Sequence, residues 1–389
     1  MPQIMIDDIN QERIDDILRP KLRLFMSVDL EGSTALKNET GILPLKNMDE
    51  VKSKIDLFPG WHKAIFEFFY EFDDLNRLIQ SEYSLFRNIH GQPKIENPKV
   101  FFPQIWKRKG DEIIYSVEII DSYHFVYCLI FFLTSIAKYR ENFGIESQDV
   151  RENDVKATIW LAGFPLVNTE TAFINPESQI RHHSRSLSTL NNLIGLYRID
   201  NTDDNRIDYI GPSVDIGFRI STLANNIKIP INVEVAYILS TVFDVGNENP
   251  NFTILEKYIK FNEEKTNYKF AHETFYDGEV NLKGVFDERG YPFFWLKAPF
   301  RNTNPLHQNK YFSKSCSKNE LKLYFESYFK ARKNFLLIPY LPKCDLLKHK
   351  DIKYIDYLES WKHEMNYLLK TNLNTRTDLN GVVSIRDEI

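Results

Sequence analysis

The sequence predicts an α+β fold, in which strands and helices are mixed along the chain. An apolar run at 22–30 has the character of a central strand, and the segment 104–119 has the pattern of a β-hairpin. Between 59 and 83, apolar residues recur at helical spacing. The 389 residues are 43% apolar and 14% aromatic, which suffices for one large domain with additions or for two domains.

In chain order, LRLFMSVDL at 22–30 ends in EGST and predicts a strand that enters a tight loop. The helix that follows begins near Pro59, and its aromatic stripe is more typical of a core than of a ligand site. The hairpin at 104–119 has β-rich apolar runs on both sides of a polar centre that contains glycine. A helix is predicted at 121–142.

The second half begins with a predicted strand at 155–168 and a polar stretch at 169–190 that we expect to be flexible. Residues 206–224 predict a strand, a Gly-Pro turn and a helix. Further strands are predicted at 231–240 and within 279–297. From about residue 300 the chain becomes rich in lysine and helical in pattern, and we expect these helices to pack on the core.

Composition and charge exclude several classes of function. The net charge of −5 and the pI near 6.0 argue against a nucleic-acid partner or an anionic membrane surface. The acidic N-terminus lacks a secretory pattern, and the most apolar run, 125–137, is too short for a bilayer, so we expect a cytoplasmic protein with no membrane segment. Three widely spaced cysteines predict neither a disulfide framework nor a zinc site.

Three short motifs carry the candidate chemistry. In VDLEGST, Asp29 ends a strand before a small-residue loop, which suits a metal and phosphate site, although the same letters are ordinary helix-capping sequence. In KRKGDEIIYS, Asp111 lies at a glycine turn, where a hairpin can bring it to the end of a neighbouring strand. Two adjacent carboxylates could bind two magnesium ions, but a Gly-Asp turn alone is common.

The third motif, DYIGPSVDIGFR, places Arg219 four residues after Asp215, on one helix face. An arginine there can stabilise charge that develops on a phosphate in a transition state. An ion pair between Asp215 and Arg219 is an equally good interpretation.

Taken in order, VDLEGST, KGDE and GPSVDIGFR resemble the motifs of the class III adenylyl and guanylyl cyclases. The resemblance implies a cyclase domain at 21–300, after an N-terminal segment at 1–20 and before a C-terminal helical extension at 301–389. It implies a ferredoxin-like core and a head-to-tail homodimer with shared active sites, in which Arg219 and Lys283 project toward the metals from differing sides of the interface.

The same resemblance assigns roles to individual residues. The metal site, for two Mg²⁺ or Mn²⁺ ions, falls to Asp29, Leu30 and Asp111. The phosphate-binding residues are Gly32, Ser33, Thr34 and Lys283. Arg219 takes the transition-state role, whereas Asp215 stands where the family usually has a ribose-binding Asn, which puts that ribose contact in question.

Asp29 and Asp111 are 82 residues apart, a long separation that most resembles the stand-alone pyrimidine cyclases of the Pycsar anti-phage system. These make cyclic CMP or cyclic UMP, which activates a separate effector. Lys107 and Asp208 match the family's base-reading positions, and a donor beside an acceptor suits cytosine or adenine, with an aromatic wall such as Phe58 or Trp61 to exclude purines. We therefore expect a CTP cyclase; the alternatives are a UTP cyclase, an adenylate cyclase, and an inactive cyclase-like sensor.

Overall fold

The computed structural model describes residues 10–33, 60–146, 154–172, 192–197, 207–244, 250–266, 268–270, 273–285, 290–299, 315–331 and 352–378. The strands are β1 (Lys21–Leu30), β2 (Gln104–Lys109), β3 (Glu112–Glu118), β4 (Val155–Phe164), β5 (Thr169–Ala172), β6 (Ile207–Ile210), β7 (Lys228–Ile231), β8 (Thr274–Val280) and β9 (Tyr291–Lys297). The helices are α1 (Gln11–Leu18), α3 (Gly60–Ile89), α4 (Pro98–Phe101), α5 (Ser122–Glu146), α7 (Pro212–Ile220), the 3₁₀ turn η4 (Ser221–Leu223), α8 (Val233–Asp244), α9 (Pro250–Lys265), α11 (Lys318–Ala331) and α12 (Ile352–Asp378).

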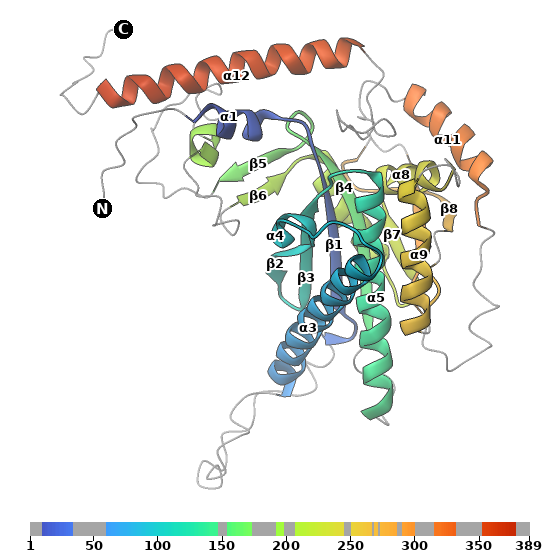
Figure 1. Ribbon diagram of the computed structural model, residues 1–389. Helices are drawn as coiled ribbons and strands as arrows, with labels where there is room; N and C mark the ends of the chain where they lie inside the picture. Colours follow the sequence, from blue (N-terminus) through green and yellow to red (C-terminus); the bar gives the residue numbers. More distant parts are fainter. Residues whose placement is uncertain are drawn as a thin grey trace, which may run out of the picture.

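The central sheet has the strand order β2-β3-β1-β4-β7-β9-β8, and its pairs are antiparallel except β4 with β7. Its first half is a β-α-β-β-α-β unit, with α3 between β1 and β2 and α5 between β3 and β4 (Figure 1). This connectivity, with β1 between β3 and β4, is that of the ferredoxin-like fold. The predicted α+β fold with a ferredoxin-like core is therefore confirmed by the topology itself.

The two faces of β1 have different neighbours, because successive side chains of a strand alternate. Leu24, Met26 and Val28 belong to the main core, together with buried residues of α3 and α5 such as Phe72. Phe25 points the other way, into a smaller cluster with Trp160 of β4. Asp29 lies four residues after Phe25 in β1, so its side chain points to the same face of the sheet, the one that α3 and α5 do not cover.

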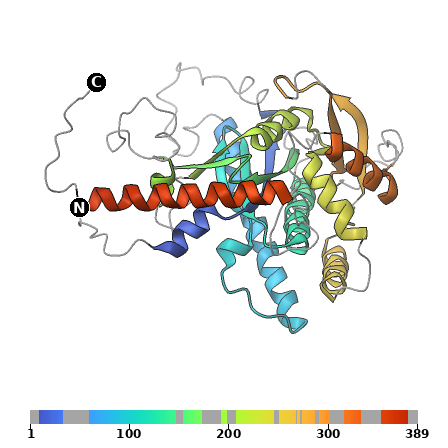
Figure 2. The ribbon, with the colours of Figure 1, turned by 90° about the horizontal axis from the view of Figure 1, so that it is seen from above.

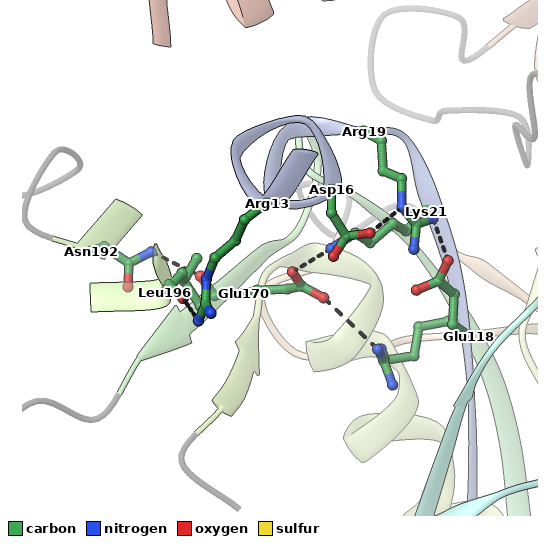
Figure 3. Close-up of polar contacts among 9 residues, drawn as sticks. Arg13, Asp16, Arg19, Lys21, Glu118, Glu170, Asn192 and Leu196 are labelled. Atoms are coloured by element: carbon green, nitrogen blue, oxygen red, sulfur yellow. Dashed lines mark hydrogen bonds and ion pairs between the residues drawn. The ribbon is translucent and has the colours of Figure 1, made fainter. Parts of the chain in front are cut away.

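The N- and C-terminal helices meet at the Lys21 end of the sheet. Leu18 of α1 and Leu369 of α12 share a small buried cluster, and the two helices lie side by side in both views (Figures 1 and 2). Ion pairs link the elements at this end: Arg19, which follows α1, contacts Glu118 of β3, and Lys21 Nζ of β1 lies 3.1 Å from Glu170 of β5, which forms a separate two-stranded sheet with β6 (Figure 3).

Most predicted elements are present, with shifted ends. The predicted helix at 59–83 is α3, the hairpin at 104–119 is β2 and β3, and the C-terminal helical patterns are α11 and α12. Part of the stretch at 169–190 is ordered, because β5 pairs with β6. None of the helices in the described ranges is long and apolar enough to cross a bilayer.

The strand predicted at 231–240 is wrong. β7 ends at Ile231, and α8 begins at Val233. Asn232 makes this start possible: its Oδ1 accepts a hydrogen bond from the backbone N of Val235 (3.2 Å), and its Nδ2 donates to the carbonyl of Leu161 (2.8 Å). A helix N-cap with tertiary support outweighs the β propensity of the valines and isoleucines that follow.

Candidate active site

Asp29 and Asp111 come together at one end of the sheet. Asp29 is the penultimate residue of β1, and Asp111 forms the turn between β2 and β3, directly before Glu112, which pairs with Asp29 across the strands. The backbone N of Leu30 donates a hydrogen bond to the carbonyl of Asp111 (3.4 Å). Burial raises the pKa of Asp29, and the adjacent Asp111 raises it further. The hairpin thus concentrates negative charge beside the end of β1.

Lys156 already neutralises part of this charge. It lies directly opposite Asp29 in the β1–β4 register, and its Nζ is 2.9 Å from Asp29 Oδ2. Partial burial acts to lower the pKa of Lys156, but the hydrogen bond and charge of Asp29, with further help from Asp111, hold it above its usual value. Lys156 had no predicted role; the available signal was a charged residue within an otherwise buried strand.

The loop after β1 contacts the same carboxylates. Ser33 Oγ donates a hydrogen bond to Asp111 Oδ2, which fixes the hairpin turn against the loop. Gly32 has φ +82°, in the left-handed region that favours glycine, and this lets the chain turn sharply after Leu30. Thr34 lies outside the described residues, so its predicted phosphate contact stays a prediction.

The donor set fits a hard divalent cation. Two carboxylates converge, and Leu30 could add only its main-chain carbonyl. No group of three or more acidic, histidine or cysteine side chains in the described ranges is placed to hold an ion. A set of few protein oxygens suits Mg²⁺ or Mn²⁺, because Mg²⁺ usually keeps several waters and completes its shell with substrate phosphates.

The two predicted base-reading residues contact each other. Lys107 of β2 and Asp208 of β6 are far apart in sequence, yet Lys107 Nζ lies 2.5 Å from Asp208 Oδ1. The ammonium also lies 4.5 Å from the centre of the Trp106 ring. Trp61, by contrast, packs on the main core of the other face and is not beside this pair. Phe58 lies outside the described residues. Trp106 is therefore the tryptophan that lies beside the predicted base-reading pair.

Helix α7, which carries the third motif, is held against the sheet by close packing. Asn168 Oδ1 accepts a hydrogen bond from the backbone N of Ser213 (3.0 Å), which caps the helix from the loop after β4. Gly211 has φ +140°, and a Cβ there would lie 2.6 Å from Asn168 Oδ1. A Cβ on Gly217 would lie 2.3 Å from the Trp160 indole. The glycines of this motif thus permit the approach that positions Arg219.

Arg219 lies beside the turn that contains Lys283. Its Nη2 would be 3.7 Å from a Cβ on Gly284, the residue after exposed Lys283. Arg219 and the turn that carries Lys283 therefore lie together within one chain. The expectation that the two cations reach the metals from differing sides of an interface stays a prediction. Asp215 is exposed, and within the described range 207–244 the structure shows no ion pair between Asp215 and Arg219.

These cations lie far from the carboxylates of the same chain. Phe294 of β9 pairs with Ile231 of β7, and Ile231 pairs with Ile159 of β4. Three residues further along these strands in the same direction, Tyr291 of β9 lies at the same height in the sheet as Ala162 of β4. The β8–β9 connection lies beyond Tyr291, because that residue closes the pairing of the two strands. Asp29 is level with Lys156, and the six-residue separation along β4 corresponds to roughly 20 Å.

Comparisons with known proteins give structural neighbours but no relatives by sequence. No family model and no curated protein matches the chain. The adenylyl cyclase from P. aeruginosa is 12% identical, covering 73% of this chain and 97% of its own, at a TM-score of 0.36. The guanylate cyclase domain from Catenaria anguillulae in complex with GTP is 10% identical, with coverage of 72% and 98% and a TM-score of 0.34. Adenylate cyclases from Trypanosoma brucei in their monomeric state are 11% identical, with coverage of 76% and 92% and a TM-score of 0.31.

Proposed function

We propose that this chain is a nucleotide cyclase that converts CTP to 3′,5′-cyclic CMP and diphosphate. The observation that carries the proposal is the joint placement of two pairs: Asp29 with Asp111, and Lys107 with Asp208. Both pairs were predicted from separate motifs, and in each the partners come from different strands or loops. A set of residues for divalent ions and a set for a base, on one domain, suit a nucleoside triphosphate.

The reaction joins the ribose 3′ oxygen to the α-phosphorus and breaks the bond from that phosphorus to the β-phosphate bridging oxygen. Asp29 and Asp111 would hold the divalent ions, which when bound help to ionise the 3′-hydroxyl and neutralise the triphosphate. The Arg219 guanidinium supplies fixed positive charge for the α-phosphate as negative charge grows there. Lys283, exposed on its turn, contacts the leaving diphosphate.

The Lys107–Asp208 pair supports a preference for cytosine. Cytosine presents a ring acceptor beside an amine donor, so it can accept from Lys107 while donating to Asp208. The same two groups satisfy each other in the free protein, and both are partly shielded from water. A base that offers one acceptor and one donor replaces that contact without leaving either charge unpaired. Trp106 beside Lys107 provides the wall that limits the size of the base.

The active site is shared between two copies in this proposal. The separation of roughly 20 Å between the carboxylates and the Arg219 end prevents one chain from placing both on the same phosphates. Mixing an Asp29→Ala protein with an Arg219→Ala protein should restore activity, because each heterodimer contains one intact site. Complete statistical exchange of a 1:1 mixture should give roughly a quarter of the wild-type rate. No recovery after verified subunit exchange would contradict the shared site.

The direct test is to incubate the purified protein with each ribonucleoside triphosphate and Mn²⁺ or Mg²⁺, and to identify products by mass. Cyclic CMP formation by the wild type, lost in Asp111→Ala, is expected. Cyclic UMP as the main product would keep the cyclase but assign it to UTP, and no cyclic product under either metal would refute the enzyme. The sequence resemblance to pyrimidine cyclases of anti-phage defence further supports a second-messenger role, in which a separate effector reads the product.

A further inference from the structure

Lys156 is the feature of the site that the proposed chemistry does not use. Its ammonium is 2.9 Å from Asp29 Oδ2, and the two residues are directly paired across β1 and β4. Both are held by strands at the centre of the sheet rather than by loops. A strand pair fixes the two Cα positions, so this contact is part of the folded site and not a chance surface approach.

Lys156 lies inside the candidate site. Its strand partner Asp29 is followed by Leu30, whose backbone N donates a hydrogen bond to the carbonyl of Asp111. The ammonium thus lies within the field of the carboxylates proposed to hold the ions. A divalent ion that takes Asp29 Oδ2 as a ligand must compete with Lys156 for the same oxygen.

We propose that the Lys156 ammonium is the resident cation of the carboxylate site: it occupies Asp29 in the metal-free protein and gives up this contact when a divalent ion binds. The proposal rests on the proposed function for its choice of ion. It assigns to Lys156 control over the metal concentration at which the site fills.

The test measures binding of Mn²⁺ to the nucleotide-free protein, by the loss of the free-ion paramagnetic resonance signal. Lys156→Met keeps the length of the side chain and removes its charge. We expect Mn²⁺ to bind this variant about fivefold more tightly, which corresponds to about 1 kcal/mol. Lys156→Arg retains a cation beside Asp29 and should bind Mn²⁺ no more tightly than the wild type.

The matched control is Lys228→Met. Lys228 of β7 also forms an ion pair with an aspartate on another strand, Asp277 of β8, across the intervening strand β9, and both partners are about as buried as Lys156 and Asp29. This pair is outside the carboxylate site, so Mn²⁺ affinity should not change. Unchanged or weaker Mn²⁺ binding by a folded Lys156→Met protein would overturn the proposal, because Lys156 would then not compete with the ion.

A double variant distinguishes a failure of the Lys156 proposal from a failure of the cyclase assignment. Asp29→Asn added to Lys156→Met should abolish the tighter Mn²⁺ binding, and its retention would overturn the proposal by placing the ion elsewhere. Tighter binding that depends on Asp29, in a protein that makes no cyclic nucleotide, would support the role of Lys156 and refute the enzyme. Melting curves of each variant confirm that the fold is intact.

Discussion

A buried carboxyl outside the site makes the stability of the protein depend on pH. Glu234 lies in the first turn of α8 and is 7% exposed, and its Oε2 has no hydrogen-bond partner in the described part of the chain. Burial raises the pKa of Glu234 from 4.5 to about 7. The folded protein therefore keeps a proton on Glu234 over a pH range in which the unfolded chain has lost it.

The sign and size of the effect follow from this difference. Below pH 4.5, Glu234 is protonated in both the folded and the unfolded protein, and its contribution to the free energy of unfolding is at its maximum. Between pH 4.5 and about 7, this contribution is lost as the pH rises, because only the unfolded chain releases the proton. At 1.36 kcal/mol per pKa unit, the loss is about 3 kcal/mol. The Glu234→Gln side chain is neutral at every pH and of the same size, so the variant should show none of this pH-dependent loss of stability.

The assay is urea unfolding of the wild type and of Glu234→Gln at pH 5 and at pH 8. The free energy of unfolding of the wild type should fall by about 2.5 kcal/mol more than that of the variant between these two pH values, because part of the loss has already occurred below pH 5. Groups that titrate in both proteins cancel in the comparison. Parallel pH dependence of the two proteins would refute the reasoning, because Glu234 would then be ionised or solvated in the fold.

Three further predictions concern the site. Asp29→Asn and Asp111→Asn should each abolish product formation while leaving the melting temperature within a few degrees of the wild type, because each removes a ligand for the ions; near-normal turnover of a folded variant would refute the metal assignment. Gly217→Ala should cost about 1–3 kcal/mol of stability by overpacking, because the new Cβ overlaps the Trp160 ring, and calorimetry checks this loss. It should also lower turnover in a rate assay, because the overlap lies two residues before Arg219. Asp208→Asn should lower CTP turnover and raise the UTP-to-CTP ratio by about tenfold, as a donor replaces an acceptor; an equal loss with all four nucleotides would show that Asp208 is structural.

The parts of the fold that were predictable are those where one periodicity dominates. The strand β1 is a nearly continuous apolar run, and α3 has apolar residues at helical spacing from Trp61 onward. The start of α8 could not be predicted in the same way. Its helix depends on Asn232, whose second partner, Leu161, is distant in sequence. A tertiary cap of this kind leaves no local signal beyond a single Asn.

The residues of the candidate site also differ in how far the sequence could predict them. Asp29, Asp111 and Arg219 stand in short motifs, and Lys107 and Asp208 were assigned as base-reading residues from the resemblance and their spacing to nearby glycines. The ion pair between Lys107 and Asp208 was not predicted. Lys156 was not predictable, because its importance arises from the antiparallel register that sets it opposite Asp29. Register is a property of two strands together, and neither sequence segment alone contains it.

The motif GPSVDIGFR at 211–219 shows why residues that take no part in the proposed chemistry can still be part of the motif. Trp160 is fully buried and contacts the rings of both Phe25 and Phe218, so it has little room to yield to a side chain at Gly217. Asn168 is likewise buried and is fixed by its bond to the Gly163 carbonyl, so it cannot yield to a side chain at Gly211. Because α7 is fixed at one end by the Asn168 cap and packs closely on Trp160 at Gly217, these contacts set the position of the Arg219 backbone, and we expect a substitution at either glycine to displace the guanidinium.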